Sequence, residues 1–183
     1  MALNRTPVFL IGFMGAGKTT FGKKLANKLG LQFVDLDGEI LQNQEPGTKN
    51  QDNTHNASIK ELIEQHGMEY FRALEAETLR LLDVQGKLIS TGGGTPCFFD
   101  NLDYMKRRGT VVFLNVDEGV ILSRLKTTDL NERPLLKGLD ETGLKKFIHE
   151  KLKERLPIYQ QADISFNPVS QKMEELLDLL NTP

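Results

Sequence analysis

The chain has 183 residues, with 23 Lys and Arg against 25 Asp and Glu, a formal net charge of −2 and a single cysteine, Cys97. This length predicts one domain, spanning 1–183, that can bury a hydrophobic core without disulfides. The charge balance argues against a general nucleic-acid binder, and no apolar run reaches the roughly 18 residues of a membrane span. No signal peptide is visible, so a cytoplasmic protein is expected.

Five short segments have the pattern of strands in a parallel sheet. The first, Val8–Ile11, is entirely apolar and stops at Gly12. The others are expected at 32–37, 87–90, 110–116 and 163–166. Helical segments fall between most of them, beginning with 18–29, and a last amphipathic helix is expected at 170–180. This alternation predicts an α/β fold, a three-layer doubly wound sheet of about five parallel strands.

Two stretches interrupt this alternation. Residues 43–56 are almost entirely polar and are predicted to form a loop. Ser58 then has the spacing of a capping box that opens a helix, and a longer helix is expected from 68 to about 84. The second stretch, 127–142, contains Pro and Gly residues between two helices. We expect it to be a hinged flap.

A phosphate-binding loop follows the first predicted strand. Residues 12–19 have the sequence Gly-Phe-Met-Gly-Ala-Gly-Lys-Thr, which matches the pattern Gly-x-x-x-x-Gly-Lys-Ser/Thr between a strand and a helix. Glycines let backbone N–H groups face phosphate oxygens, and the helix N-terminus adds positive partial charge. Lys18 is expected to reach the β- and γ-phosphates, and Thr19 to ligate Mg²⁺. The loop indicates a nucleotide, but other residues must decide between a kinase, a GTPase, a motor and a switch.

Two carboxylates and a glycine run suggest where a phosphoryl acceptor binds. Asp35 and Asp37 are two residues apart on the second predicted strand, so they are expected on one face at its carboxyl end. One can hold a magnesium-bound water and the other can accept a hydrogen bond from an attacking hydroxyl. Aspartates also end strands and begin turns, but beside a phosphate loop the functional interpretation is favoured. Gly92, Gly93 and Gly94 follow the third predicted strand and can expose backbone N–H groups to a substrate.

Four arginines are candidates for binding anionic groups. Taken singly, Arg72 has the pattern of a helix-surface ion-pair stripe, and Arg155 that of a solvated charged helix face. Arg133 lies in the predicted flap, where it can swing over a triphosphate and neutralise developing charge. Arg124, on the preceding helix, is close enough in sequence to touch the nucleotide. The alternative for the last two is that they are ordinary surface arginines.

In combination, these motifs resemble the shikimate kinase family along essentially the whole chain. The matching stretches are 12–19, 33–37, Phe71-Arg72 with Glu75, 92–94, 133–136 and Arg155-x-Pro157-x-Tyr159. The resemblance implies ATP-dependent phosphorylation of the 3-hydroxyl of shikimate to shikimate 3-phosphate, on the pathway to chorismate and the aromatic amino acids. It also implies a P-loop fold of nucleoside-monophosphate-kinase type. Its parts would be a core at 7–37, 86–126 and 157–183, a substrate-binding subdomain at about 38–85 and a lid at about 127–142.

The resemblance further implies roles for single residues. The nucleotide would be bound by Gly15, Ala16, Gly17, Lys18, Thr19, Thr20, Arg124 and Arg133. Shikimate would be bound by Asp37, Arg72, Gly92, Gly93, Gly94 and Arg155, with the two arginines on its carboxylate. Thr19 would hold Mg²⁺ directly and Asp35 through water, and the catalytic residues would be Lys18, Asp37 and Arg133. The expected form is a monomer acting on ATP and shikimate, with no nucleic-acid or membrane partner.

Two other functions stay open at this point. A related small-molecule kinase could act on gluconate or on a nucleoside monophosphate, and the chemistry of the acceptor would distinguish it. A nucleotide-binding switch could signal through its flap without turnover. The presence of Lys18, Thr19, Asp35 and Asp37 argues against such a degenerate site.

Overall fold

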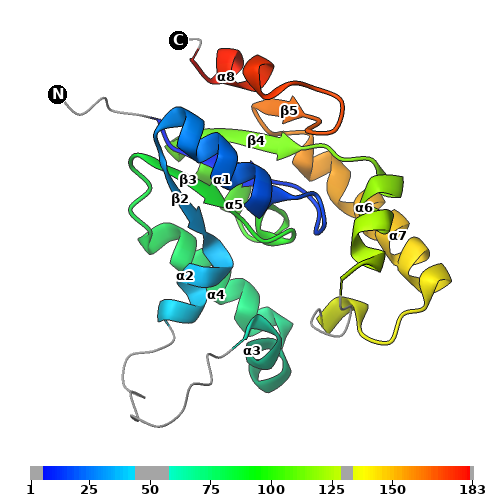
Figure 1. Cartoon of the computed structure of the whole chain (residues 1–183). Coiled ribbons are helices and arrows are strands. Elements are labelled where there is room, and N and C mark those ends of the chain that lie inside the picture. The colour runs from blue at the N-terminus through cyan, green and yellow to red at the C-terminus, as the bar shows by residue number, and fades with distance from the viewer. Residues whose placement is uncertain (1–5, 44–57, 129–133, 182–183) are drawn as a thin grey trace, which may run out of the picture.

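A five-stranded parallel sheet forms the centre of the computed structural model, which describes residues 6–43, 58–128 and 134–181 (Figure 1). The strand order is β2-β3-β1-β4-β5. The strands are β1 Val8–Ile11, β2 Gln32–Asp35, β3 Lys87–Ser90, β4 Thr110–Leu114 and β5 Ile164–Phe166. Every strand pair is parallel. The predicted doubly wound α/β sheet is confirmed.

Helices connect the strands and cover both faces of the sheet (Figure 1). The α-helices are α1 Lys18–Leu29, α2 Leu36–Asn43, α3 Ile59–His66, α4 Met68–Leu81, α5 Asn101–Arg108, α6 Glu118–Lys126, α7 Glu141–Tyr159 and α8 Met173–Asn181. Among the described residues, the 3₁₀ helices η1 Thr95–Cys97 and η3 Pro134–Leu136 lie in the connections. In the part of the chain that the structure describes, no helix has the length and apolar character needed to cross a membrane.

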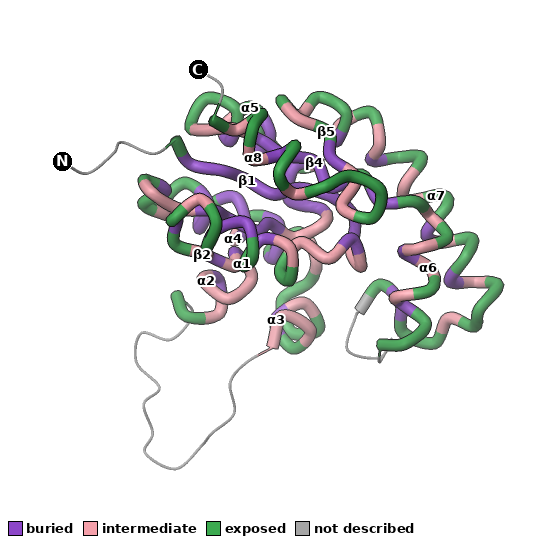
Figure 2. The backbone as a smooth tube through the Cα atoms, turned by 45° about the horizontal axis from the view of Figure 1, so that its top comes forward, coloured by how far each residue is buried: buried purple, intermediate pink, exposed green. Residues whose placement is uncertain are grey.

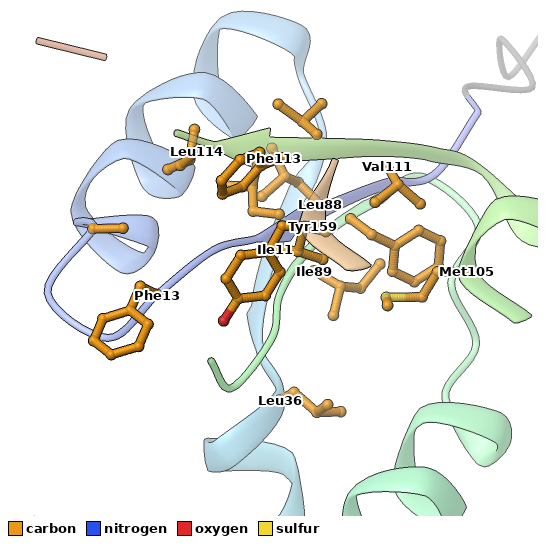
Figure 3. Close-up of a cluster of buried hydrophobic side chains, with 14 of the residues drawn as sticks. Ile11, Phe13, Leu36, Leu88, Ile89, Met105, Val111, Phe113, Leu114 and Tyr159 are labelled. Atoms are coloured by element: carbon orange, nitrogen blue, oxygen red, sulfur yellow. The ribbon is translucent and has the colours of Figure 1, made fainter. Parts of the chain in front are cut away.

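The hydrophobic core lies on the central strands and beneath the inner faces of the helices, as the purple tube in Figure 2 shows. Strand β1 is buried along its whole length, because β3 and β4 flank it and helices cover both of its faces. Figure 3 shows Phe113 of β4 and Tyr159 of α7 among these core side chains, with ring centroids 5.1 Å apart. Gly22 lets α1 approach the sheet, since a Cβ there would lie 2.8 Å from the Phe33 ring. The core thus holds α1 against a face of the sheet and Tyr159 of α7 against β4.

The helix boundaries follow the local signals in the sequence. Ser58 accepts a hydrogen bond from Glu61 N–H, and the Glu61 side chain accepts one from Ser58 N–H, so the predicted capping box is present. Gly67 then separates α3 from α4 with a φ of 87°. The helix predicted at 68 to about 84 ends at Leu81, and the last helix begins at Met173 rather than 170. The predicted loop lies almost wholly in 44–57, outside the described residues.

The strand predicted at 32–37 is wrong at its end. Strand β2 stops at Asp35, and α2 begins at Leu36. The Asp35 carboxylate accepts a hydrogen bond from Asp37 N–H at 3.2 Å, which caps the new helix. The helix places Asp37 in its first turn, so the two carboxylates do not share one strand face as predicted. The strand predicted at 110–116 is also shorter and ends at Leu114.

Candidate active site

The phosphate loop joins β1 to α1 in a conformation that requires its glycines. Gly12, Gly15 and Gly17 have φ values of 142°, 79° and 91°, a region that side chains with a Cβ rarely adopt. A Cβ on Gly12 would also lie only 2.9 Å from the Leu114 carbonyl oxygen of β4. The loop therefore sits at the carboxyl end of the central strand, where open α/β sheets bind ligands.

Two cationic side chains lie against this loop. Lys18 Nζ donates hydrogen bonds to the carbonyl oxygens of Gly12 at 2.8 Å and Phe13 at 3.0 Å. Arg124 of α6 donates from Nη1 to the carbonyl oxygens of Gly15 at 3.1 Å and Ala16 at 2.9 Å. The structure thus places Arg124, a predicted nucleotide-binding residue, beside the phosphate loop.

A cavity of about 360 Å³ opens beside Arg124. Its lining residues are Ala16, Gly17, Thr20, Phe21, Lys24, Arg124 and Pro168. The lining combines the start of α1 with the guanidinium of Arg124 and the ring of Pro168. An aromatic base can stack on a guanidinium plane, so this cavity suits the base of a nucleotide whose phosphates lie in the loop.

The candidate magnesium ligands also lie together. The Thr19 hydroxyl donates a hydrogen bond to Asp35 Oδ2 at 3.0 Å, which joins the start of α1 to the end of β2. Hydroxyl and carboxylate oxygens are the donors that Mg²⁺ prefers, with phosphate and water completing its octahedron. Within the described ranges, no group of three or more His, Cys, Asp or Glu side chains could hold a metal by itself. The two oxygens therefore fit an ion that arrives with a nucleotide.

A second cavity, of about 430 Å³, gathers every residue expected to bind the acceptor. These residues are Asp37, Arg72, Gly92, Gly93, Gly94 and Arg155, which come from α2, α4, the segment after β3, and α7. An apolar part of the wall is formed by Met14, Ile59, Ile63, Met68, Phe71 and Leu135. The cavity adjoins the phosphate loop, since a Cβ on Gly93 would lie 3.1 Å from Met14 N and 3.4 Å from the Gly12 carbonyl oxygen.

Arg72 is held at the cavity wall by several neighbours. Its side chain is only 9% exposed and forms an ion pair with the fully buried Glu75. Its guanidinium carbon lies 4.7 Å from the ring centroid of Phe98 and 5.3 Å from that of Phe71. Arg72 is thus no member of a surface ion-pair stripe, and that interpretation of the isolated residue is wrong.

Arg155 is also buried, with 4% of the residue exposed, although its neighbours in sequence are charged. Its guanidinium carbon lies 5.8 Å from the ring centroid of Phe13 in the phosphate loop. The nearby Tyr159 hydroxyl donates a hydrogen bond to the Gly93 carbonyl oxygen. The interpretation of Arg155 as part of a solvated helix face is therefore wrong, because α7 turns this residue inward against the cavity.

Asp37 is an acidic residue of the cavity lining, together with Glu75. Burial raises the pKa of its carboxyl to about 6, and the negative charges of Glu75 and Asp35 act in the same direction. In the described residues, three buried side-chain polar atoms have no hydrogen-bond partner: Asp37 Oδ1, Arg72 Nε and Arg155 Nε. All three belong to residues that line the acceptor cavity. Buried polar atoms are normally paired, so these three indicate a polar ligand.

The sequence analysis did not single out part of the cavity wall. Ile59, Lys60 and Ile63 of α3 line it, as do Thr128 and Leu135. Lys60 could have been recognised as a candidate from the sequence. It occupies the first turn of a helix, where the helix dipole disfavours a cation, so a lysine there suggests a role other than helix stability. The expected lid arginine, Arg133, lies outside the described residues.

Comparison with known proteins decides the family. A family model described as shikimate kinase matches residues 14–180 of the chain. The chain belongs to the shikimate kinase family. Members of this family transfer a phosphoryl group to shikimate in the biosynthesis of aromatic amino acids, which confirms the function that the sequence indicated.

Individual relatives agree with this family along most of their length. The shikimate kinase of Bacteroides fragilis is 39% identical over 183 residues, covering 95% of this chain and 96% of the relative. That of Persephonella marina is 41% identical over 158 residues, covering 86% of this chain and 85% of the relative.

Solved shikimate kinases share the fold. The crystal structure of the enzyme from Bacteroides thetaiotaomicron has a TM-score of 0.82 and 37% identity, and the match covers 96% of this chain and 98% of that one. The enzyme from Acinetobacter baumannii, solved in complex with shikimate, has a TM-score of 0.80 and 30% identity over 96% of this chain and 93% of that one. A gluconokinase from Sinorhizobium meliloti reaches a TM-score of 0.55 at 17% identity, which shows a shared fold alone.

Proposed function

We propose that this chain carries out its family's reaction by binding shikimate in the acceptor cavity and ATP at the phosphate loop, transferring the γ-phosphoryl group to the 3-hydroxyl. The observation that carries the proposal is a set of three buried atoms around one cavity beside the phosphate loop, Asp37 Oδ1, Arg72 Nε and Arg155 Nε, none of which has a hydrogen-bond partner among the described residues. Shikimate offers one carboxylate and three hydroxyls, which are the groups that two guanidiniums and a carboxylate can bind.

Arg72 and Arg155 hold the substrate carboxylate in this proposal. Planar guanidinium donors engage a carboxylate through parallel charge-assisted hydrogen bonds, which Lys cannot reproduce. Glu75 already neutralises much of the charge of Arg72. No described residue forms an ion pair with Arg155, which leaves its charge for the substrate. Gly92, Gly93 and Gly94 line the same cavity and present their backbone to the substrate ring.

Asp37 orients the attacking hydroxyl. Phosphoryl transfer passes through a loose transition state, so alignment and charge stabilisation contribute more than a strong base. With a pKa of about 6, Asp37 is a carboxylate at pH 7.5 and can accept a hydrogen bond from the 3-hydroxyl. The positive charge of Lys18 acts on this carboxylate, which indicates that the two catalytic groups lie near each other.

The cationic groups of the nucleotide site stabilise the phosphates. Lys18 exchanges its bonds to the loop carbonyls for the β- and γ-phosphates, and Arg124 lies against the base and loop. Thr19 holds Mg²⁺ directly and Asp35 through water. The ion, when bound, neutralises negative charge on the transferring phosphoryl group. Arg133 adds a further positive charge from the lid.

Residues 127–142 act as the lid, and 38–85 as the substrate-binding subdomain. Thr128 and Leu135 line the acceptor cavity together with Ile59 and Ile63 of α3. Lys137 also forms an ion pair with Glu64 of α3 at 3.5 Å. Contacts between lid and subdomain exclude water from the cavity, and water would otherwise compete as the acceptor.

A coupled assay of ADP release, with ATP and Mg²⁺ and with or without shikimate, tests the proposal. We expect ADP release to depend on shikimate, and to be small when gluconate or a nucleoside monophosphate replaces it. Folded protein that binds ATP but releases no ADP with shikimate would contradict the proposal. Turnover with another acceptor instead would show that shikimate is not the substrate.

The enzyme is further proposed to act as a monomer in the cytoplasm. All the candidate residues come from one chain, so no second copy is needed to complete the site. A single cysteine excludes an intrachain disulfide, which agrees with a reducing compartment. Light scattering on the purified enzyme, with and without substrates, tests the oligomeric state, and a mass of two chains under assay conditions would contradict it.

A further inference from the structure

Thr95 lies directly after the cavity glycines but does not line the cavity. It begins the 3₁₀ helix η1 and is completely buried, with 0% exposed. Its hydroxyl donates a hydrogen bond to Glu75 Oε1 at 2.5 Å, while Glu75 Oε2 accepts one from Arg72 Nη1. Both oxygens of the Glu75 carboxylate are therefore occupied, so its plane is fixed. The direction of the Arg72 guanidinium depends on that plane.

The turn that carries Thr95 is itself anchored to α4 by polar contacts. Asn101 Nδ2 donates a hydrogen bond to the Thr95 carbonyl oxygen at 2.9 Å, and Asn101 is completely buried. Asn101 Oδ1 accepts a hydrogen bond at 2.9 Å from Arg80 Nη1, on the same helix as Arg72. A continuous series of bonds thus runs from Arg80 through Asn101 and Thr95 to Glu75. Such networks specify one arrangement when every member is satisfied.

Phe98 follows the same turn and contacts Arg72 directly. Its ring centroid lies 4.7 Å from the guanidinium carbon, within the range of a cation–π interaction. Gly94 leaves the space that the guanidinium occupies, because a Cβ there would lie 2.5 Å from Arg72 Nη2. Gly94 and Phe98 therefore both lie against the Arg72 guanidinium. The Nε atom of Arg72 is buried and has no hydrogen-bond partner among the described residues.

We propose that Thr95 and Phe98 are positioning residues that set the direction of the Arg72 guanidinium toward the carboxylate of the acceptor, Thr95 through Glu75 and Phe98 by stacking. This inference rests on the proposed function of Arg72 as a carboxylate ligand. The physical reason is preorganisation: a long side chain that is already held in its binding conformation loses less freedom when the ligand arrives.

The first test uses Thr95→Val, which removes the hydroxyl at nearly constant volume, and Thr95→Ser, which keeps it. We expect Thr95→Val to raise the KM for shikimate roughly tenfold, since a buried carboxylate oxygen loses its donor. The KM for ATP should stay within twofold, and Thr95→Ser should stay near the parent enzyme. Thr78→Val is the matched control, because Thr78 is a buried threonine of α4 outside the acceptor cavity.

Phe98→Leu provides a second variant that is safe for folding, since 38% of Phe98 is exposed. We expect a rise in the KM for shikimate of roughly threefold, as loss of a partly exposed cation–π contact implies, and recovery with Phe98→Tyr. Both variants are then combined with Arg72→Ala, where neither should change the KM further.

Values of KM for shikimate within twofold of the parent enzyme in both variants would overturn the inference. So would equal increases with and without Arg72, because a merely structural effect adds to any background. If Arg72→Ala alone leaves the KM unchanged, the assignment of Arg72 fails, and the inference fails with it. If Arg72→Ala raises the KM but neither positioning variant does, only the inference fails.

Discussion

Arg72 and Arg155 line the same cavity from two different helices, α4 and α7, and each keeps a buried Nε atom without a partner among the described residues. Neither arginine stands out in its local sequence: Arg72 has a glutamate three residues to either side, and Arg155 belongs to a run of charged residues. Burying a guanidinium with an unpaired N–H has a cost in free energy, which a bound carboxylate would remove. The presence of both arginines in one cavity is therefore the feature on which binding of the acceptor carboxylate depends.

Arg155→Ala should raise the KM for shikimate roughly 10- to 100-fold, since a charge-assisted hydrogen bond is worth about 1.5–3 kcal/mol. The KM for ATP should change little. Lys153→Ala is the matched control, because Lys153 is an exposed cation of the same helix. Steady-state kinetics measures both constants, and an unaltered KM for shikimate in Arg155→Ala would remove this residue from the site.

Asp37→Asn should abolish turnover while ATP affinity stays nearly unchanged, because the amide cannot accept the hydroxyl hydrogen bond as a carboxylate does. In the parent enzyme, kcat/KM for shikimate should fall as the pH drops below about 6, since burial raises the pKa of Asp37 to about 6 and protonation removes the carboxylate. Initial rates between pH 5 and 8 and ATP titrations test this. A large loss of ATP binding, or a flat profile across pH 6, would speak against the role.

The same carboxyl should affect stability with a defined sign. The folded pKa of about 6 exceeds the ordinary value of 3.8, so the folded state binds the proton more tightly than the unfolded state. This stabilising contribution is complete below pH 3.8 and is lost as the pH rises through 6. Asp37→Asn should therefore raise the melting temperature by about 2–4 °C at pH 7.5, with little difference at pH 4. Calorimetry at both pH values measures it, and a lower melting temperature at pH 7.5 would refute the expected sign.

Gly94→Ala should displace the guanidinium of Arg72, because the added Cβ would lie 2.5 Å from Nη2 and 2.6 Å from Cζ. We expect the KM for shikimate to rise at least roughly tenfold, the scale of a lost charge-assisted hydrogen bond. The fold should stay intact, since the clash is with the end of a long side chain and not with backbone. In Gly119→Ala, the control, the Cβ would meet no atom within 4 Å, and stability should rise by about 0.5–1 kcal/mol. Equal kinetic constants in the two variants would contradict this prediction.

Asp35→Asn should raise the Mg²⁺ concentration needed for half-maximal activity by roughly 10-fold or more, the usual effect of losing a group that holds a metal through water. Asparagine keeps the oxygen that caps α2, so the position of Asp37 should be preserved. Activity is measured across a Mg²⁺ titration at saturating ATP and shikimate. An unchanged Mg²⁺ requirement would exclude Asp35 from the metal site.

Local signals in the sequence were sufficient for the parts of the molecule that depend on short-range geometry. The phosphate loop, its glycines and Lys18 follow from one contiguous motif, since the backbone itself forms that site. The capping box at Ser58 and the α/β alternation are equally local. Asp37 was predicted as a site residue but on a strand, because the pattern of apolar residues continues through Leu36 and hides the start of α2.

The sequence by itself therefore determined the fold class, the nucleotide loop and, through the family resemblance, the residues to inspect. Only the tertiary structure decided that Arg72 and Arg155 are buried together, that Thr95 reaches Glu75, and that a cavity opens beside the phosphate loop. The physical reason is that helical and strand periodicities describe which face of one element is apolar, whereas a polar cavity arises where faces of several elements meet. The packing of the whole sheet and its helices determines which faces meet, so a short window of sequence cannot predict the cavity.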